Sequence, residues 1–403
     1  MTTKNNIPAG YKYSAVGIIP QEWEVKRIKD LGSVITGSTP PTADVSNYGS
    51  EYMFVSPADL SDNQKYVLST EKMLSSKGYA ISRKMPKGTI LYTCIGSTIG
   101  KIGIASRELT SNQQINAVIC NDKNEYLYYA LLLTTGRIKM LAGEQAVPII
   151  NKSEFENIKL AVPPMEEQRK IAEILGVWDE AIEKQSRLIE KLELRKRGLM
   201  QRLFAGRMRI PGFNTPWQKV KLGEIFKERN ETRCENLPLL SITADKGVIL
   251  QSESDKKDTS NEDKSKYKRI CPNDIGYNTM RMWQGRSALS SLEGIVSPAY
   301  TIVTPKVELD MRFISELIKQ PRVVYDFWTH SQGLVGDTLN CKFHDFSQVR
   351  VLLPSLSEQK AIAEMLATAD NEIVAHRKKL DSLRMQKRGL MQQLLTGKIR
   401  VKI

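Results

Sequence analysis

The chain has little of what most catalytic and metal sites are built from. Among 403 residues it has three histidines, His330, His344 and His376, and none precedes residue 330. Its five cysteines are scattered and show no CxxC spacing, which predicts free thiols and no disulfide framework or zinc site. They are Cys94, Cys120, Cys234, Cys271 and Cys341. The sequence therefore predicts no metal site.

Long apolar runs and cofactor motifs are also missing. No apolar stretch approaches the roughly 20 residues that a membrane span needs, and residues 1–13 have no apolar signal-peptide core. We therefore expect a cytoplasmic protein without a membrane partner. The run Gly96–Lys101 is similar to a phosphate loop, but it is one residue short and Ile102 replaces the magnesium-binding hydroxyl. No catalytic or cofactor-binding residue is predicted.

Positive charge is abundant. The net charge is +14 and the isoelectric point is about 9.4, which suits a protein that binds a polyanion such as a nucleic acid. Charge of this size also serves solubility alone, so both interpretations stay open at this point.

A large internal repeat dominates the sequence. Residues 160–210 and 351–401 align without a gap at a constant offset of 191, and 19 of the 51 positions are identical. The identical positions include the tails Lys196–Gln201 and Lys387–Gln392. Weaker similarity persists upstream, where Ile90–Thr93 aligns with Ile275–Asn278. The chain is therefore two copies of one unit.

Each copy consists of a globular body followed by a long helical segment. The bodies mix short β-rich runs such as 88–92, 117–120 and 300–303 with helical stretches at 125–134 and 311–319. We therefore predict an α/β (α+β) fold in two copies related by a pseudo-twofold repeat. The predicted domains are residues 1–164 and 212–355, and the predicted helical spacers are 165–211 and 356–403.

The helical segments carry apolar residues at alternating steps of four and three, which is typical of a coiled-coil seam. The first seam comprises Ile171, Leu175, Trp178, Ile182, Gln185, Ile189, Leu192, Leu199 and Leu203. The second comprises Ile362, Leu366, Ile373, His376, Leu380, Leu383, Leu390 and Leu394. Polar residues interrupt both seams at equivalent places, Gln185 with His376 and Lys196 with Lys387. We predict an antiparallel coiled coil, against the alternative of two helices that each pack only on their own body.

One aligned stretch of the bodies suggests recognition of base edges. Residues 277–286 concentrate arginine, amide and aromatic side chains that can read bases in the major groove, while the aligned residues 92–101 hold smaller groups. The alternative is a strand and turn whose arginines merely pack. The candidate DNA-binding residues are Thr93, Ser97, Thr98, Lys101, Asn278, Arg281, Trp283, Gln284 and Arg286. Basic residues near the helix ends, such as Arg209, could touch phosphates or form a solvated or partner-binding face.

Over essentially its whole length the chain resembles the specificity subunit of type I restriction–modification systems. The resemblance is carried by the segments 163–182 and 354–373 with their Lys-Arg-Gly-Leu-Met-Gln tails, by the opening Trp23, and by the run 294–300. It implies two target-recognition domains that each read one half of a bipartite, asymmetric site in double-stranded DNA. The helices would set the gap between the half-sites.

The resemblance also implies partners. The helices would dock two modification subunits, which bring S-adenosylmethionine and methylate adenine, and restriction subunits would bring ATP and magnesium. The chain itself would bind none of these cofactors and would not be an enzyme. The alternatives are a coiled-coil scaffold, a DNA-binding protein without a methyltransferase partner, and an autonomous enzyme, for which the sequence lacks motifs.

Overall fold

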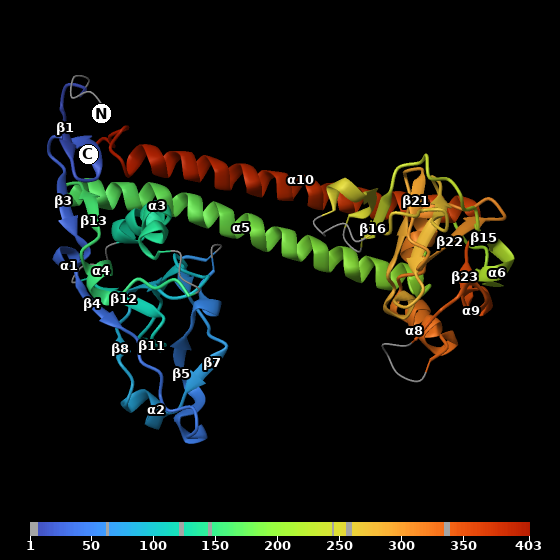
Figure 1. Cartoon of the computed structure of the whole chain (residues 1–403), viewed down its shortest axis with the longest axis horizontal. Helices are drawn as coiled ribbons and strands as arrows, with labels where there is room; N and C mark the ends of the chain where they lie inside the picture. The colour runs from blue at the N-terminus through green and yellow to red at the C-terminus, as the bar shows by residue number, and fades with distance from the viewer. Residues whose placement is uncertain are drawn as a thin grey trace. The chain divides into compact units, whose positions relative to one another are not determined.

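The computed structural model describes residues 7–61, 64–120, 125–143, 147–243, 246–254, 260–333 and 339–403. It divides into two compact units, one formed by Met1–Ile189 with Ala375–Ile403 and the other by Glu190–Val374 (Figure 1). Each unit thus combines one globular body with part of both long helices.

The first body is built around a five-stranded sheet. Its strands in spatial order are β4 (Ser33–Thr36), β12 (Ile115–Ile119), β9 (Ile90–Thr93), β10 (Ile102–Ala105) and β6 (Tyr66–Val67). All neighbours are antiparallel except β10 and β6. Helix α3 (Glu125–Leu141) packs on this sheet through the fully buried Leu127, Tyr129 and Leu131. Strands β9 and β10 are buried along their whole length, as expected for the middle of a sheet covered on both faces.

Smaller elements complete the first unit. A second sheet has the order β7 (Lys72–Leu74), β5 (Tyr48–Val55), β11 (Leu109–Ser111) and β8 (Lys84–Met85). Two-stranded pairs are formed by β1 (Tyr11–Ser14) with β2 (Gly17–Pro20) and by β3 (Glu24–Arg27) with β13 (Lys159–Val162). The short helices are α1 (Ile28–Leu31), α2 (Ser76–Ala80) and α4 (Lys152–Glu156), with 3-10 turns η1 (Val45–Asn47) and η2 (Pro57–Asp59).

The second body repeats the first at its centre. Its main sheet has the order β15 (Phe226–Glu228), β22 (Tyr300–Pro305), β19 (Ile275–Asn278) and β20 (Ser287–Leu289). This order matches β4, β12, β9 and β10 strand for strand. The predicted alignment of Ile90–Thr93 with Ile275–Asn278 is therefore confirmed, because both segments are the third strand of equivalent sheets.

The remaining elements of the second unit follow the same plan with changes at the edges. The two-stranded pairs are β14 (Gln218–Lys221) with β23 (Arg350–Leu353), β16 (Leu240–Thr243) with β17 (Gly247–Leu250), and β18 (Lys268–Ile270) with β21 (Gly294–Val296). The helices are α6 (Leu222–Ile225), α7 (Met311–Leu317), α8 (Pro321–His330) and α9 (Phe343–Gln348), with 3-10 turns η3 (Gln251–Glu253) and η4 (Met282–Gln284). Pro321 stands at the first turn of α8, so a break separates α7 from α8 where the first body has the single helix α3.

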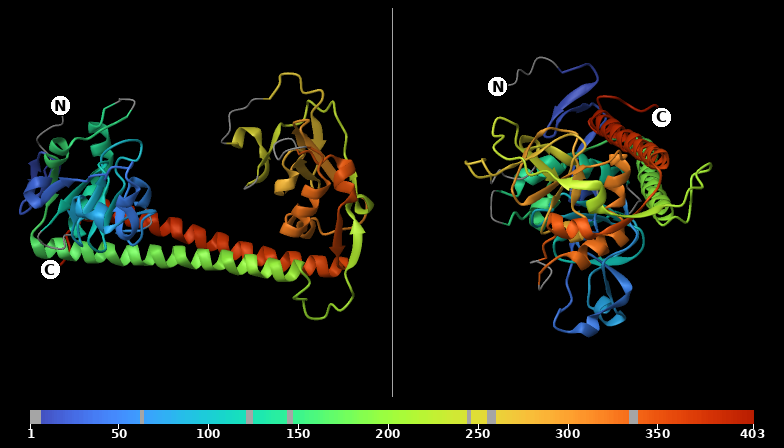
Figure 2. Two further views of the ribbon diagram at one scale, coloured as in Figure 1. Left: turned by 90° about the horizontal axis from the view of Figure 1, so that it is seen from below. Right: turned by 90° about the vertical axis from the view of Figure 1, so that its right-hand side faces the viewer.

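The two long helices are α5 (Met165–Phe204) and α10 (Leu356–Leu394), and they pack side by side in antiparallel directions (Figures 1 and 2). Gly206 and Gly397 follow their ends with φ of 66° and 70°, the left-handed conformation that ends many helices. Most predicted seam residues are buried. The partly buried ones are Trp178, Leu199, His376, Leu383 and Leu390.

The polar residues in the seams contact the opposite helix. In the first unit, the Gln185 amide lies 2.8 Å from Nδ1 of His376 and donates to the His376 carbonyl at 2.9 Å. In the second unit, Lys196 Nζ lies 2.6 and 2.7 Å from the Asp370 carboxylate oxygens. Lys387 makes the equivalent ion pair with Asp179 in the first unit. Polar pairs at fixed places in an apolar seam favour one register over its neighbours.

Candidate nucleic-acid interface

The candidate residues of the first body lie at the turn between β9 and β10. Thr93 is fully buried at the end of β9, so a direct contact of its side chain with DNA does not fit this placement. The turn is held by backbone bonds, including Gly100 N–H to the Thr93 carbonyl at 3.0 Å. Ser97 is exposed and Thr98 is partly exposed at its tip. Lys101 donates to the Pro57 carbonyl at 3.1 Å.

A basic groove runs from this turn to the helices. It has a volume of about 860 Å³ and is lined by Ser97, Thr98, residues of α3 and residues of α10. Six lysines or arginines line it, together with the carboxylate of Asp179. They are Lys65, Lys101, Lys139, Arg384, Lys387 and Arg388. Three of these cations are in ion pairs, Lys65 with Glu125, Lys387 with Asp179 and Arg384 with Asp381, so the excess of positive charge comes mainly from the other three. The groove therefore suits a phosphate-bearing ligand.

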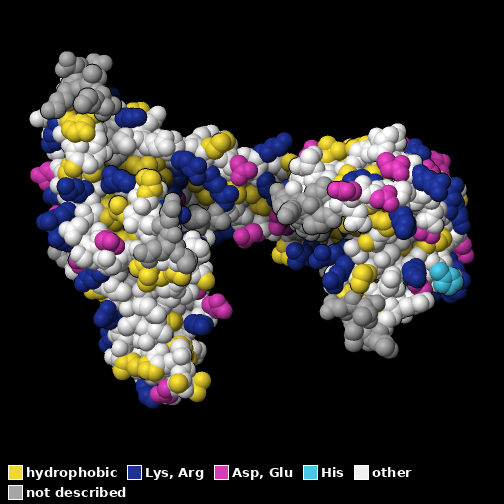
Figure 3. All heavy atoms as spheres, in the orientation of Figure 1, with side chains coloured by type: hydrophobic (Ala, Val, Ile, Leu, Met, Phe, Trp, Pro, Cys, Tyr) yellow, Lys and Arg dark blue, Asp and Glu magenta, His cyan; other side chains and the backbone are white. Residues whose placement is uncertain are grey.

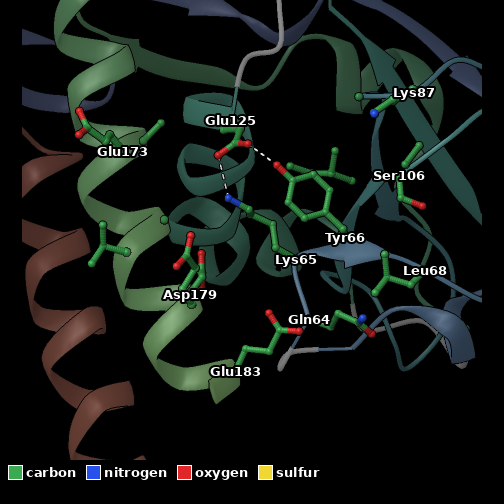
Figure 4. A pocket seen from close by; sticks show the side chains of 17 residues that line it. Gln64, Lys65, Tyr66, Leu68, Lys87, Ser106, Glu125, Glu173, Asp179 and Glu183 are labelled. Carbon is green, nitrogen blue, oxygen red and sulfur yellow. Dashed lines mark hydrogen bonds and ion pairs between the residues drawn. The ribbon is translucent and has the colours of Figure 1, made fainter. Parts of the chain in front are cut away.

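A neighbouring groove on the same unit has the opposite charge (Figure 4). It has a volume of about 730 Å³, and its lining carries five carboxylates and two lysines. The carboxylates belong to Glu125, Glu173, Asp179, Glu180 and Glu183. The chain as a whole has a net charge of +14, but this groove is negatively charged. Its negative charge repels phosphates, which makes the surface unsuitable for the DNA backbone.

A polar network in the acidic groove ties the first body to the helices. Lys65 lies 2.7 Å from Glu125, and Tyr66 also donates to Glu125 (Figure 4). Lys65 also lies 3.3 Å from the Tyr129 hydroxyl. The Tyr129 hydroxyl donates to Asp179 on α5. Burial and the Asp179 charge raise the pKa of Tyr129, so it stays protonated as the donor.

We expect Tyr129→Phe to lower the unfolding free energy of the first unit by about 2 kcal/mol, because it removes a buried hydrogen bond to a charged group. Hydrogen exchange of α3 and the start of α5 would report the loss. Tyr13→Phe is the control, because Tyr13 is 76% exposed. Equal protection in both variants would show that the Tyr129 hydroxyl contributes nothing to docking.

The candidate residues of the second body form a compact turn after β19. Arg281 precedes η4, and Gly285 follows it with φ of 73°, a left-handed conformation that glycine adopts without strain. The Trp283 indole donates to the Met280 carbonyl at 2.9 Å. Gln284 and Arg286 are exposed. The Asn278 side chain accepts from the Met280 N–H at 2.9 Å.

The structure shows one repeated site that the sequence interpretation missed. In the first unit, the buried Glu167 accepts from the Trp23 indole at 2.9 Å and pairs with Arg400 at 2.7 and 2.9 Å. In the second unit, Glu358 accepts from Trp217 at 3.2 Å and pairs with Arg209 at 2.7 and 2.8 Å. We call these two clusters the Trp–Glu–Arg clamps.

The clamps correct one interpretation of the basic helix ends. Arg209 was a candidate for phosphate contact or for a solvated face. The structure instead commits its guanidinium to both oxygens of Glu358, and Arg400 does the same with Glu167. Such bidentate pairs fix geometry. Each arginine fastens the segment after a helix onto the start of the other helix.

Both copies of the repeat are similar to one family of known proteins. The family model for the type I restriction modification DNA specificity domain matches residues 20–194 and again residues 214–384. The chain belongs to this family. Each match begins shortly before a clamp tryptophan and ends inside a long helix, so the family domain corresponds to one copy of the repeat.

Relatives match over nearly the full length. The chain is 28% identical over 416 residues to the type I restriction enzyme MjaVIII specificity subunit of Methanocaldococcus jannaschii, covering 95% of this chain and 94% of the relative. Its fold is similar to the crystal structure of a type I restriction–modification S subunit from M. genitalium (TM-score 0.55, 16% identity, 93% and 96% covered). It is also similar to a chain from a study of complex assembly and conformational transition of the type I R-M system (TM-score 0.60, 17% identity, 94% and 99% covered).

Two properties of the described residues bear on catalysis: whether they can hold a metal ion and whether their thiols are reactive. No three His, Cys, Asp or Glu side chains among the described residues lie close enough to hold a metal ion. Burial raises the pKa of the Cys94 and Cys341 thiols to about 12, which leaves them protonated and poorly nucleophilic. In the described residues no helix is long and apolar enough to cross a bilayer.

Proposed function

We propose that this chain gives a type I restriction–modification complex its DNA sequence specificity, with each body reading one half of a bipartite, asymmetric site. The observation that carries the proposal is the duplicated sheet, together with the two matches of the specificity-domain family. Equivalent strands, β9 and β19, end in turns with different side chains. Two domains that recognise different DNA sequences need this combination of a shared fold and different recognition surfaces.

Base contacts are assigned to the tips of these turns. The second turn offers Gln284 and Arg286, whose side chains can pair with adenine and guanine edges in the major groove. The first turn offers the hydroxyls of Ser97 and Thr98 and lies at the basic groove, where Lys139 and Arg388 would contact phosphates. We expect DNA to avoid the face that carries the acidic groove.

Partners would supply all of the chemistry. Two modification subunits docked on the helices would bring S-adenosylmethionine and methylate adenine, and restriction subunits would bring ATP and magnesium. Family membership supports these partners. A complex purified through this chain should hold two modification subunits for each copy of it, measured by native mass spectrometry.

The adenine methylome of the host, with and without this gene, tests the function. Loss of methylation at one bipartite motif is the expected result and would also give the target sequence. If methylation does not change, DNA binding of the purified complex against salt decides the matter. Phosphate contacts to DNA should give an affinity that falls steeply with salt, whereas a coiled-coil scaffold would not bind DNA.

The helices would act as a ruler for the gap between half-sites. Insertion of seven residues beside Gln185 and seven beside His376 keeps the polar pair between the helices and adds about 10 Å. We expect a methylated motif with a wider gap and unchanged half-sites. A changed half-site would contradict the ruler. The control variant substitutes seven exposed residues of the helices and leaves the helix lengths unchanged.

A further inference from the structure

Helix α8 exposes two aromatic side chains. Tyr325 is 60% exposed and Trp328 is 48% exposed, with ring centroids 5.5 Å apart and an interplanar angle of 36°. The opposite face of the helix is already used, because Val323 and Phe327 are buried in the core of the second body. Exposed apolar side chains that lie together and are rimmed by polar residues are a feature of contact sites.

This pair lies beside the candidate base-reading turn. Helix α8 packs against η4, and a Cβ on Gly285 would lie 3.0 Å from Cγ2 of Val324, the residue before Tyr325. Arg322 is exposed one turn before Tyr325. The single carboxylate on α8 belongs to Asp326, and His330 contacts its backbone carbonyl at 2.7 Å. On α8 itself, polar residues therefore flank the two rings.

The equivalent place on the first body differs in chemistry. At the offset of 185 that aligns β9 with β19, Met140 corresponds to Tyr325 and Gly143 to Trp328. Met140 is also strongly exposed, at 77%. Both bodies thus expose this position, but with different side chains. Two copies of one protein partner would need like surfaces on both bodies, whereas two different DNA half-sites would not.

We propose that Arg322, Tyr325 and Trp328 extend the DNA-contact surface of the second body beyond its turn. The two rings pack on deoxyribose and thymine methyl groups of the second half-site, and Arg322 contacts a phosphate. This inference rests on the proposed function and adds specificity-determining residues to it. The ligand is double-stranded DNA.

The test uses the complex of this chain with its modification subunits and a duplex carrying the methylated motif. We expect the double variant Tyr325→Ala/Trp328→Ala to lose about tenfold in affinity without a change in salt dependence, because apolar contacts release no counterions. Arg322→Ala should instead reduce the salt slope by about one. Tyr13→Ala, another exposed tyrosine substitution, should bind as the unaltered complex does.

Duplexes with one half-site scrambled locate the effect. The aromatic variant should lose its preference for an intact second half-site and keep its preference for the first. Unchanged affinity on every duplex would overturn the inference, and so would loss of the modification subunits, which would make the surface a protein-docking site. If the unaltered complex binds no DNA, the proposed function fails as well, and that result is distinct from a loss confined to the variant.

Discussion

Replacing Glu358 with alanine is expected to destabilise the second unit by on the order of 3 kcal/mol. The Glu358 side chain is 1% exposed and forms an ion pair with Arg209, whose own side chain is 29% exposed. Its loss leaves the Arg209 guanidinium and the Trp217 indole without their shared acceptor. Removing one partner of a buried pair costs more than the pair itself contributes, because the remaining group stays desolvated.

Hydrogen exchange resolved by peptide would measure this loss where it occurs. Protection should fall around β14 and the first turns of α10, while α3 of the first unit should exchange as before. Glu372→Ala is the matched control, since Glu372 is an exposed glutamate of the same helix and should change stability by less than about 0.5 kcal/mol. Equal effects of the two substitutions would show that the clamp does not stabilise the unit.

Glu167→Ala should act on the first unit in the same way but less strongly. Arg400 is 36% exposed, so water can partly replace its lost partner. The comparison of the two variants tests whether the two clamps, equivalent in sequence and geometry, stabilise only their own units.

Repetition made the helices and the central strands predictable from sequence. A periodic seam fixes which face of a helix is buried, and two copies with the same polar interruptions indicate that the interruptions matter. The structure explains them, since Gln185 meets His376 while Lys196 and Lys387 each pair with an aspartate of the opposite helix. Those aspartates, Asp179 and Asp370, are themselves equivalent in the repeat.

The clamps could not be predicted in the same way. Their members are far apart in the sequence, with Glu167 and Arg400 separated by 233 residues. Only the antiparallel packing of the helices brings them together. A signal was present, because the glutamate and arginine are identical in both copies and each body opens with a tryptophan. If the two helices are assumed to be antiparallel, the glutamate at the start of one repeated block meets the arginine at the end of the other. Their identity in both copies then indicates that they pair.

Within the candidate turns, residue type alone could not separate buried from exposed side chains. Thr93 and Asn278 hold equivalent positions at the ends of β9 and β19, yet Thr93 is fully buried and Asn278 is partly exposed. Burial at a strand end depends on the elements that cover it, and these differ between the bodies. Divergence between the two copies is informative only beyond the strand ends, from Ser97 onward in the first body and from Arg281 onward in the second.

Among the candidate base contacts, Arg286 is expected to give the largest change in specificity. It is exposed at the end of the turn that follows η4. An arginine that pairs with a guanine edge contributes about 1–3 kcal/mol of discrimination against other bases. Arg286→Ala should therefore relax one position of the second half-site by roughly tenfold to a hundredfold and leave the first half-site and the gap unchanged. Methylome sequencing of a host that carries the variant would show this directly.

The first body supplies the reciprocal experiment. Ser97→Ala/Thr98→Ala should alter only the first half-site, because these hydroxyls lie at the tip of the other turn. The outcome for Arg286→Ala that contradicts base reading is an equal weakening of both half-sites with a reduced salt slope, since that is the behaviour of a phosphate contact. Arg286→Lys sharpens the distinction. Lysine keeps the positive charge but lacks the planar guanidinium group. The lysine variant should therefore keep a phosphate contact and lose the bidentate hydrogen bonds to a base.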